Sequence, residues 1–259
     1  MALVFMVAFL GAAPVVSAAS QVAKSSTNGY DISWPQCGRA YPSQPAFGIV
    51  GVNAGIVFSA NPCLQSELAW AGGATGQLYA NTANPGPTLS THWPDGQTYP
   101  LACNPSRTTL LSDRDTWACA YDYGYNAAAD SYNDAVLAFG KLGLGPATPA
   151  GSAWWFDVET SNSWRTDVTL NVAALQGAVL YLNLVGVANT RIGFYSTQYQ
   201  WNQITGGPAT SFDAFKSWVA GASSARGASA KCVGSGFTGG GVALAQYPSG
   251  GFDADLRCT

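Results

Sequence analysis

The sequence predicts an α/β protein built around a mostly parallel sheet. Seven short β-like runs alternate along the chain with helical or loop segments. Several of these runs are almost continuously apolar, as strands buried on both faces are. The clearest are FGIVGV at 47–52 and AWWFDV at 153–158. Buried strands that alternate with helices are typical of a sheet covered by helices.

The elements follow in order from these patterns. Strands are expected at 29–33, 47–53, 77–81, 153–159, 191–196, 217–222 and 242–247, and helices at 63–72, 126–142 and 170–187. The segment 82–125 is rich in Pro, Thr, Ser, Asn and Asp and interrupts the alternation. A segment of this length without regular structure is unusual inside a domain unless it is functional or stapled.

The N-terminus resembles a secretory signal peptide. Residues 1–16 are uncharged and mostly apolar, and the small residues Ser17, Ala18 and Ala19 offer a cleavage site. We expect a signal peptide at 1–18, a polar linker at 19–28 and one domain at 29–259. A buried helix or a membrane anchor is the alternative for the first run, and no later segment has the length and apolarity of a transmembrane helix.

Six cysteines are consistent with an exported, disulfide-bonded protein. Sequence proximity favours the pairs Cys37–Cys63, Cys103–Cys119 and Cys232–Cys258, although six cysteines allow 15 pairings. The Cys103–Cys119 pair would staple the 82–125 segment. No Cys-x-x-Cys occurs and His92 is the only histidine, so we predict neither a zinc site nor any other metal or cofactor.

The charge content excludes two classes of partner. Charged residues make up 10% of the chain and the net charge is −3, which is unlike the basic surface that binds nucleic acid or an anionic membrane. The chain instead holds nine Trp, twelve Tyr and eleven Phe. Aromatic side chains of this number favour an uncharged polar ligand such as a glycan.

Two carboxylates end the apolar run at 153–158. Asp157 and Glu159 are two residues apart, so in an extended strand both side chains point to the same face. Neighbouring carboxylates raise one another's proton affinity, so one of a pair can stay protonated while the other is ionised. General acid catalysis with an anionic helper needs this combination. The alternative is that both carboxylates merely end a strand and face water.

Other predicted strands also end in polar residues. Because the C-terminal ends of parallel strands converge at one mouth of a barrel, these residues are expected to meet in one pocket. The alternative is that strand ends are polar because loops begin there. The set comprises Asp31, Asn53, Asn81, Tyr195, Ser196, Gln246 and Tyr247, followed by Asp253 and Asp255.

Five tryptophans lie near the same strand ends. Aromatic walls with a few convergent polar groups are typical of a ligand cleft, whereas core packing is the alternative for any one of them. We expect two or three to line the site, with Trp155 and Trp218 as substrate contacts. The five are Trp34, Trp155, Trp164, Trp201 and Trp218.

An ordered set of short motifs resembles glycoside hydrolase family 25, the Chalaropsis-type lysozymes. The resemblance spans 29–257 and also extends to the DUF1906 glycoside-hydrolase-like domain of secreted actinobacterial proteins. Arg257 stands where the family motif closes with Asn. The motifs are Gly29-Tyr30-Asp31-Ile32-Ser33 with Gln36, Asp157-Val158-Glu159, Phe194-Tyr195-Ser196, Trp218-Val219-Ala220, Gln246-Tyr247 and the Asp-x-Asn-like end at Asp255.

The resemblance implies an irregular TIM-like (β/α) barrel with fewer than eight helices. It also implies cleavage of the β-1,4 bond between N-acetylmuramic acid and N-acetylglucosamine. Glu159 would be the general acid and Asp157 would orient the substrate or stabilise positive charge. Asp31 and Asp255 would complete the acidic cleft, with Asp253 competing for the role of Asp255. Tyr195 would bind substrate, and Gln246 is expected beside it.

Two function hypotheses follow. The first is a secreted, monomeric muramidase-like hydrolase that acts on peptidoglycan outside the cell. The second is a catalytically weak or inactive glycan-binding module on the same barrel. The first predicts an open cleft that holds both Asp157 and Glu159, whereas the second tolerates their burial in salt bridges or their occlusion by the 82–125 segment.

Overall fold

Eight strands form a closed barrel in the computed structural model, which describes residues 1, 28–43, 45–207 and 210–258. The predicted signal peptide and most of the linker fall on residues 2–27, outside the described residues. Each strand pairs with the next one in the sequence, and β8 pairs with β1. The strands are β1 (Asn28–Ile32), β2 (Gly48–Gly51), β3 (Gln77–Asn81), β4 (Trp154–Asp157), β5 (Ile192–Ser196), β6 (Lys216–Val219), β7 (Val242–Ser249) and β8 (Phe252–Arg257).

The mostly parallel sheet is confirmed, with one exception that the sequence analysis missed. Strands β1 to β7 run parallel to one another, whereas β8 pairs antiparallel with both β7 and β1. A two-residue turn causes the reversal, because Gly250 and Gly251 adopt φ values of 62° and 84°. Paired positive φ angles form the turn that suits a tight hairpin. The Gly-Gly pair was therefore an available signal for β8.

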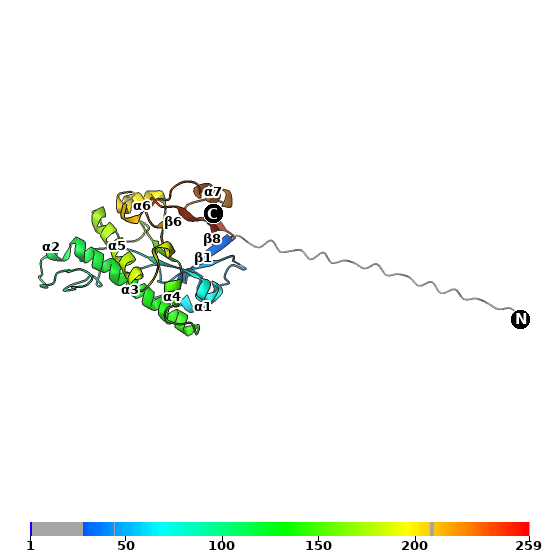
Figure 1. Ribbon diagram of the computed structural model, residues 1–259, viewed down its shortest axis with the longest axis horizontal. Coiled ribbons are helices and arrows are strands. Elements are labelled where there is room, and N and C mark those ends of the chain that lie inside the picture. The colour runs from blue at the N-terminus through cyan, green and yellow to red at the C-terminus, as the bar shows by residue number, and fades with distance from the viewer. Residues whose placement is uncertain (2–27, 44, 208–209, 259) are drawn as a thin grey trace.

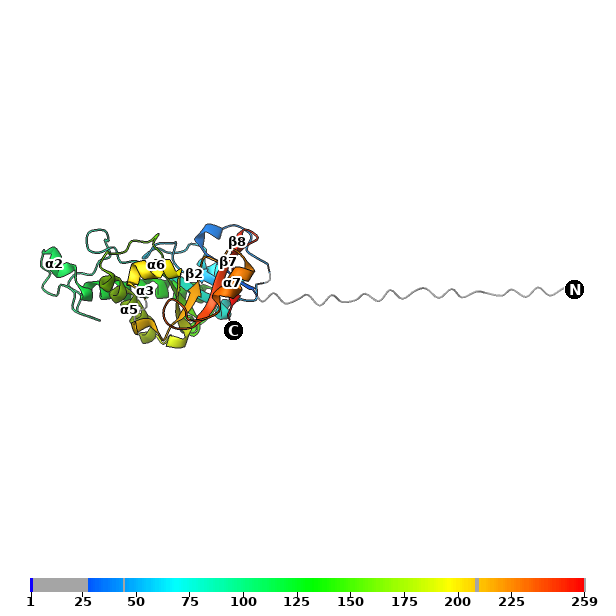
Figure 2. The same ribbon diagram turned by 90° about the horizontal axis from the view of Figure 1, so that it is seen from above.

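Seven α-helices occur among the described residues, so the expectation of fewer than eight is confirmed. Helices α2, α4, α6 and α7 are short and were not predicted. The ribbons of α3 and α5 lie side by side, and α2 lies at the edge farthest from β1 and β8 (Figures 1 and 2). The helices are α1 (Leu64–Trp70), α2 (Leu111–Arg114), α3 (Trp117–Lys141), α4 (Thr148–Gly151), α5 (Val168–Leu184), α6 (Gln198–Thr205) and α7 (Ala225–Lys231).

Helix α3 begins nine residues before the predicted start at Asn126. The Thr116 side chain caps the helix by accepting a hydrogen bond from the Cys119 amide at 3.2 Å, so Thr116 is the N-cap. The segment between β3 and α3 is therefore 82–116, shorter than the predicted 82–125. The Cys103–Cys119 disulfide ties this segment to the first turn of α3.

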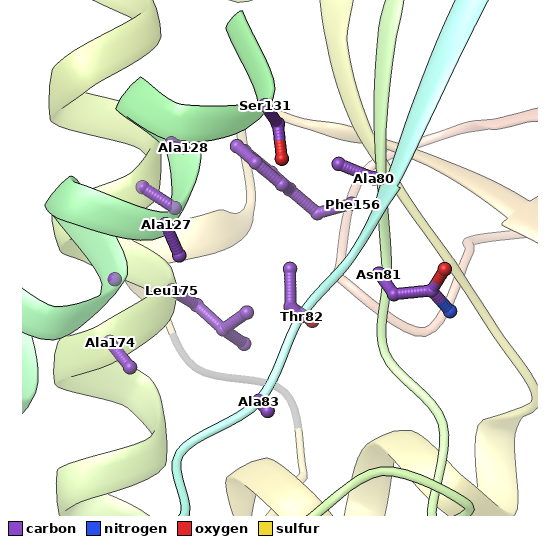
Figure 3. Close-up of a pocket in the computed structure, with 12 residues that line it drawn as sticks. Ala80, Asn81, Thr82, Ala83, Ala127, Ala128, Ser131, Phe156, Ala174 and Leu175 are labelled. Atoms are coloured by element: carbon purple, nitrogen blue, oxygen red, sulfur yellow. The ribbon is translucent and has the colours of Figure 1, made fainter. Parts of the chain in front are cut away.

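Small residues bring α3 and α5 into close contact. A Cβ added at Gly124 would lie 1.8 Å from the Ala174 carbonyl oxygen, and one at Gly177 would lie 1.9 Å from the Tyr121 carbonyl oxygen. The helices and strands β3 and β4 enclose a small cavity that Ala128, Leu175 and Phe156 line (Figure 3). Its volume is about 10 Å³, which is close to the minimum for one water molecule, so it is a packing void.

The interior of the barrel is aromatic. The rings of Trp155 and Trp218 meet edge to face with centroids 5.9 Å apart, and Ile49 and Leu244 complete this layer. Gly193 makes room for the Trp155 ring, since a Cβ there would lie 2.3 Å from it. A larger apolar layer packs the outer face of the strands against the helices.

Two further disulfides hold the remaining cysteines, Cys37 with Cys63 and Cys232 with Cys258. The first joins the chain after β1 to the start of α1, and the second joins the end of α7 to the end of β8. No helix within the described part of the chain is long and apolar enough to cross a membrane.

Candidate active site

Carboxylates from three strands meet at the mouth of the barrel where the parallel strands end. Asp31 is the second-to-last residue of β1, Asp157 is the last residue of β4, and Glu159 follows two residues later. Asp253 joins them from the start of β8, because this strand runs in the opposite direction and pairs Asp253 with Asp31. They line a cavity of about 180 Å³ together with Tyr79, Tyr195, Trp218 and Gln246.

Asp157 is the most deeply buried carboxylate that lines the cavity, with 4% of its surface exposed. Its Oδ2 accepts a hydrogen bond from Asn81 Nδ2 at 2.5 Å, whereas its Oδ1 has no donor. Burial raises the pKa of Asp157 well above its usual value, and the charges of Glu159 and Asp31 raise it further. Asp157 therefore favours its protonated form and can store a proton in the site.

Asn81 is held in place by Asn53. The Asn81 amide donates to Asn53 Oδ1 at 3.0 Å, and Asn53 Nδ2 donates to the Asn81 carbonyl at 3.2 Å. Neither amide lines the carboxylate cavity. These two strand-end residues, which the sequence analysis placed in the pocket, instead position the donor that contacts Asp157.

Glu159 lies beyond the end of β4 and is partly exposed to the cavity. The backbone around it is fixed, because its carbonyl oxygen accepts hydrogen bonds from Trp164 Nε1 at 2.8 Å and from the Asn162 amide at 3.1 Å. Trp164 thus braces the loop and is not a wall of the cavity. Glu159 is a carboxyl that can reach a bound ligand while Asp157 stays buried behind it.

A hydrogen-bonded chain connects the opposite wall of the cavity to Asp31. The Tyr195 hydroxyl donates to Gln246 Oε1 at 2.8 Å, and Gln246 Nε2 donates to Asp31 Oδ2 at 2.9 Å. Burial raises the pKa of Asp31 to about 7, and the hydrogen bond from Gln246 opposes this rise. The structure therefore brings together three of the strand-end residues that were predicted to meet, namely Asp31, Tyr195 and Gln246.

Asp255 occupies a different place from the one expected. It is fully buried inside the barrel, accepts a hydrogen bond from Trp218 Nε1 at 2.7 Å and does not line the cavity. Burial raises its pKa well above the usual value, as does the charge of Asp31. Asp253, two residues earlier on the same face of β8, is exposed and lines the cavity in its place.

The tryptophans divide between wall and core. Trp218 lines the cavity and contacts the Tyr195 ring with centroids 4.5 Å apart. Trp155 does not line it, because its ring fills the barrel interior and its Nε1 donates to Gln77 Oε1 at 2.8 Å. Trp201 is buried in the layer beneath the helices, and Trp34 is 46% exposed beside Gly55.

Tyr79 lines the cavity although the sequence analysis did not select it. It is two residues before Asn81 on β3, so both side chains point to the inner face of the barrel. The period of two was the signal that could have identified it. Burial raises the pKa of Tyr79 well above its usual value, so its hydroxyl stays protonated.

A second cavity of about 390 Å³ lies beside the turn that follows Glu159. Loops after β2, β3 and β4 line it, and they include Phe58, His92 and Ser161. The Phe58 and His92 rings are stacked with centroids 4.3 Å apart. The start of the 82–116 segment therefore forms a wall of this cavity and leaves the carboxylate cavity open.

Among the described residues, no group of three or more His, Cys, Asp or Glu side chains is arranged to hold a metal ion. Asp157 accepts a hydrogen bond from the Asn81 amide and lies in hydrogen-bonding contact with Glu159. Asp31 accepts one from Gln246, which in turn accepts one from the Tyr195 hydroxyl. Such an arrangement can move a proton to or from a bound ligand and can stabilise positive charge.

Comparison with known proteins places this geometry on a shared fold. A muramidase from Trichobolus zukalii has 16% sequence identity and a TM-score of 0.54, and the alignment covers 90% of this chain and 93% of that protein. The bacterial lysozyme from Streptomyces coelicolor has 12% identity and a TM-score of 0.53, with 92% and 94% covered. This chain has their barrel fold.

Two further comparisons concern the sequence and a modular protein. The family model "Lysozyme-like protein 1" matches residues 149–231, the stretch that contains Asp157 and Glu159. No curated protein matches the chain in sequence. The autolysin LytC from Streptococcus pneumoniae, solved in complex with a synthetic peptidoglycan ligand, has 13% identity and a TM-score of 0.51 over 88% of this chain and 46% of that one.

Proposed function

We propose that the protein is a secreted muramidase-like glycoside hydrolase that cleaves β-1,4 linkages in the glycan strands of peptidoglycan. The observation that carries the proposal is the cavity at the barrel mouth, where Asp157 and Glu159 lie together with Asp31 and Asp253. The match to a lysozyme-like model over 149–231 and the barrel shared with muramidases support it. Within this class, the motifs resemble those of glycoside hydrolase family 25 and of the DUF1906 domain.

The roles of the two central carboxyls follow from their exposure. Glu159 protonates the glycosidic oxygen, because it is the partly exposed member of the pair. Asp157 holds the proton of the pair in the resting state and shares it with Glu159 through a hydrogen bond. The proton passes from Asp157 to Glu159 and on to the glycosidic oxygen, and as the bond breaks the remaining carboxylates stabilise the positive charge that develops on the sugar ring. A water molecule then adds to the anomeric carbon and returns a proton to the Asp157–Glu159 pair, which restores the resting state.

The shape of the mouth supports a polymeric, uncharged ligand. Residues of the turn at 159–162 line both the carboxylate cavity and the Phe58–His92 cavity, and each cavity is of a size to hold a sugar ring or two. Serine, threonine and asparagine side chains in the second cavity can bind hydroxyl or acetamido groups. Aromatic rings beside them suit the apolar face of a sugar.

An extracellular location completes the proposal. All six cysteines are paired in disulfides, and such bonds persist in oxidising compartments. The signal peptide predicted at 1–18 would supply the route of export. The monomeric state predicted from the sequence is part of the same proposal.

The test is the release of reducing ends from purified peptidoglycan by the wild-type protein and by Glu159→Gln. General acid catalysis contributes about 10²–10⁴-fold, so we expect the substitution to lower turnover by at least about 100-fold. Binding of glycan fragments should persist, because glutamine keeps the size and the hydrogen-bonding groups of the side chain. Asp157→Asn should also lower turnover, since it removes the proton that the pair shares.

Glu67→Gln is the matched control. Glu67 is the other glutamate of the chain, is buried away from the cavity and accepts a hydrogen bond from Asn61 Nδ2 at 2.6 Å, which glutamine can also accept. This variant should keep wild-type turnover. Equal turnover in the wild type and Glu159→Gln rules out this acid. Fragment binding without hydrolysis by any variant, wild type included, favours the glycan-binding module.

A further inference from the structure

The opposite end of the barrel holds a cavity that the proposed hydrolase does not use. Its volume is about 600 Å³, and it opens where the parallel strands begin, away from the carboxylate mouth. Trp155 and Gln77 line it, so the tryptophan that is missing from the proposed active site faces this end. The cavity is therefore separate from the proposed active site.

Three cations line this cavity, and no Asp or Glu side chain of the described residues does. Arg191 immediately precedes β5, Lys216 begins β6, and Arg257 ends β8. They meet because β5 and β6 start at this end of the barrel while the antiparallel β8 finishes here. The chain has only 11 lysines and arginines and a net charge of −3, so a cavity with three cations departs from its overall charge.

None of the three cations is neutralised within the described residues. The sole ion pair in that part of the chain joins Arg165 to Asp115. The Arg257 guanidinium lies over the Phe47 ring, 4.6 Å from its centroid, and Arg191 donates to the Gly151 carbonyl. These contacts position the two guanidinium groups and leave most of their N–H donors available to a ligand.

We propose that this cavity binds an oxyanion, the phosphate or carboxylate groups of an anionic ligand. Two guanidinium groups and an ammonium around one hollow provide charge-assisted hydrogen bonds, and arginine binds phosphate and carboxylate oxygens in a bidentate manner. Neutral donors and acceptors on Thr75, Gln77 and Ser152 add polar contacts at the wall. The site is separate from the carboxylate mouth, so its occupation does not depend on the proposed hydrolysis.

The test is calorimetric titration of the full chain with inorganic pyrophosphate and, in a parallel arm, with citrate at low ionic strength. The variant R191Q/K216Q/R257Q should weaken binding by at least roughly tenfold, because a hydrogen bond to a charged group is worth about 1.5–3 kcal/mol and 1.4 kcal/mol is a factor of ten. The control R39Q/K141Q/R226Q removes the same charge from exposed positions away from the cavity and should change affinity less than about twofold.

A second measurement locates the ligand. The indole Nε1–H of Trp155 donates to Gln77 at this cavity, so its ¹⁵N–¹H resonance should shift on titration of the wild type and not of the cavity variant. Tighter binding of pyrophosphate assigns the site to phosphate, and tighter binding of citrate assigns it to carboxylate. The proposal is overturned if neither probe binds the wild type, or if both triple variants lose affinity equally.

Discussion

The Gln246 side chain lowers the pKa of Asp31 in the proposed active site. Its pKa of about 7 means that the carboxyl is largely protonated below neutral pH and ionised above it. Burial is the main cause of the high value, and the hydrogen bond from Gln246 Nε2 lowers it because the donor stabilises the charged form. A single residue on β7 therefore influences the charge of the proposed active site near physiological pH.

Replacing Gln246 tests this coupling. Gln246→Leu removes the donor, so the pKa of Asp31 should rise further, by roughly one pH unit for a hydrogen bond to a charged group. The measurement is a pH titration of the Asp31 carboxyl carbon by NMR. Tyr195→Phe is the control, because it removes the hydroxyl that contacts Gln246 and leaves the Gln246–Asp31 bond in place. An unchanged Asp31 midpoint in Gln246→Leu would contradict the assignment.

Helices α3 and α5 depend on close backbone contact. Gly124 and Gly177 lie where each helix touches the carbonyl groups of the other, and alanines of both helices line the packing void in Figure 3. Glycine is unfavourable inside a helix by about 1 kcal/mol relative to alanine, so these positions are retained at a cost in helix propensity. The cost is offset by the tight packing that it permits.

Gly124→Ala should destabilise the protein by about 1–3 kcal/mol or more, because the new methyl group would clash with the Ala174 carbonyl and separate the helices. Gly140→Ala lies on the same helix with nothing within 4 Å of the added Cβ. That substitution should leave stability unchanged or raise it by up to about 1 kcal/mol. Denaturant unfolding of both variants makes the comparison, and equal stability changes would show that the contact is unimportant.

At the scale of the whole molecule, charge is segregated along the barrel. Carboxylates gather at the mouth where parallel strands end, and three cations gather at the opposite end. Two disulfides join loops to helices α1 and α3, and the third joins the end of α7 to the end of β8. The barrel is therefore the scaffold, and the Cys103–Cys119 bridge ties the 82–116 segment to α3.

Removing the Cys103–Cys119 bridge should lower the free energy of unfolding and leave hydrolysis intact. Cys103→Ala/Cys119→Ala opens a loop closed over a sequence separation of 16 residues, and a loop of this length is worth roughly 3 kcal/mol of unfolding free energy. The carboxylate cavity contains no residue from 82–116, so hydrolysis of short glycan fragments should persist below the new unfolding midpoint. Chemical denaturation and fragment turnover test this. Unchanged stability, or loss of turnover in the folded variant, would contradict it.

The sequence by itself determined the α/β class, the order of the first seven strands and the convergence of Asp31, Asp157, Glu159, Tyr195 and Gln246. These follow from local rules, because apolar runs predict buried strands and parallel strands end at one mouth. The Gly250–Gly251 turn and the alternation on β3 are further sequence signals, which indicate β8 and Tyr79.

Only the tertiary structure decided which inward-facing residues reach the mouth. Trp155 and Asp255 both point into the barrel, as their positions on the strands predict. Trp155 lies near the end where the parallel strands begin, and Asp255 lies beneath the carboxylate cavity, against Trp218. Depth depends on the register between neighbouring strands and on the reversal of β8, and both are set by contacts between residues far apart in the sequence. The meeting of Arg191, Lys216 and Arg257 has the same cause.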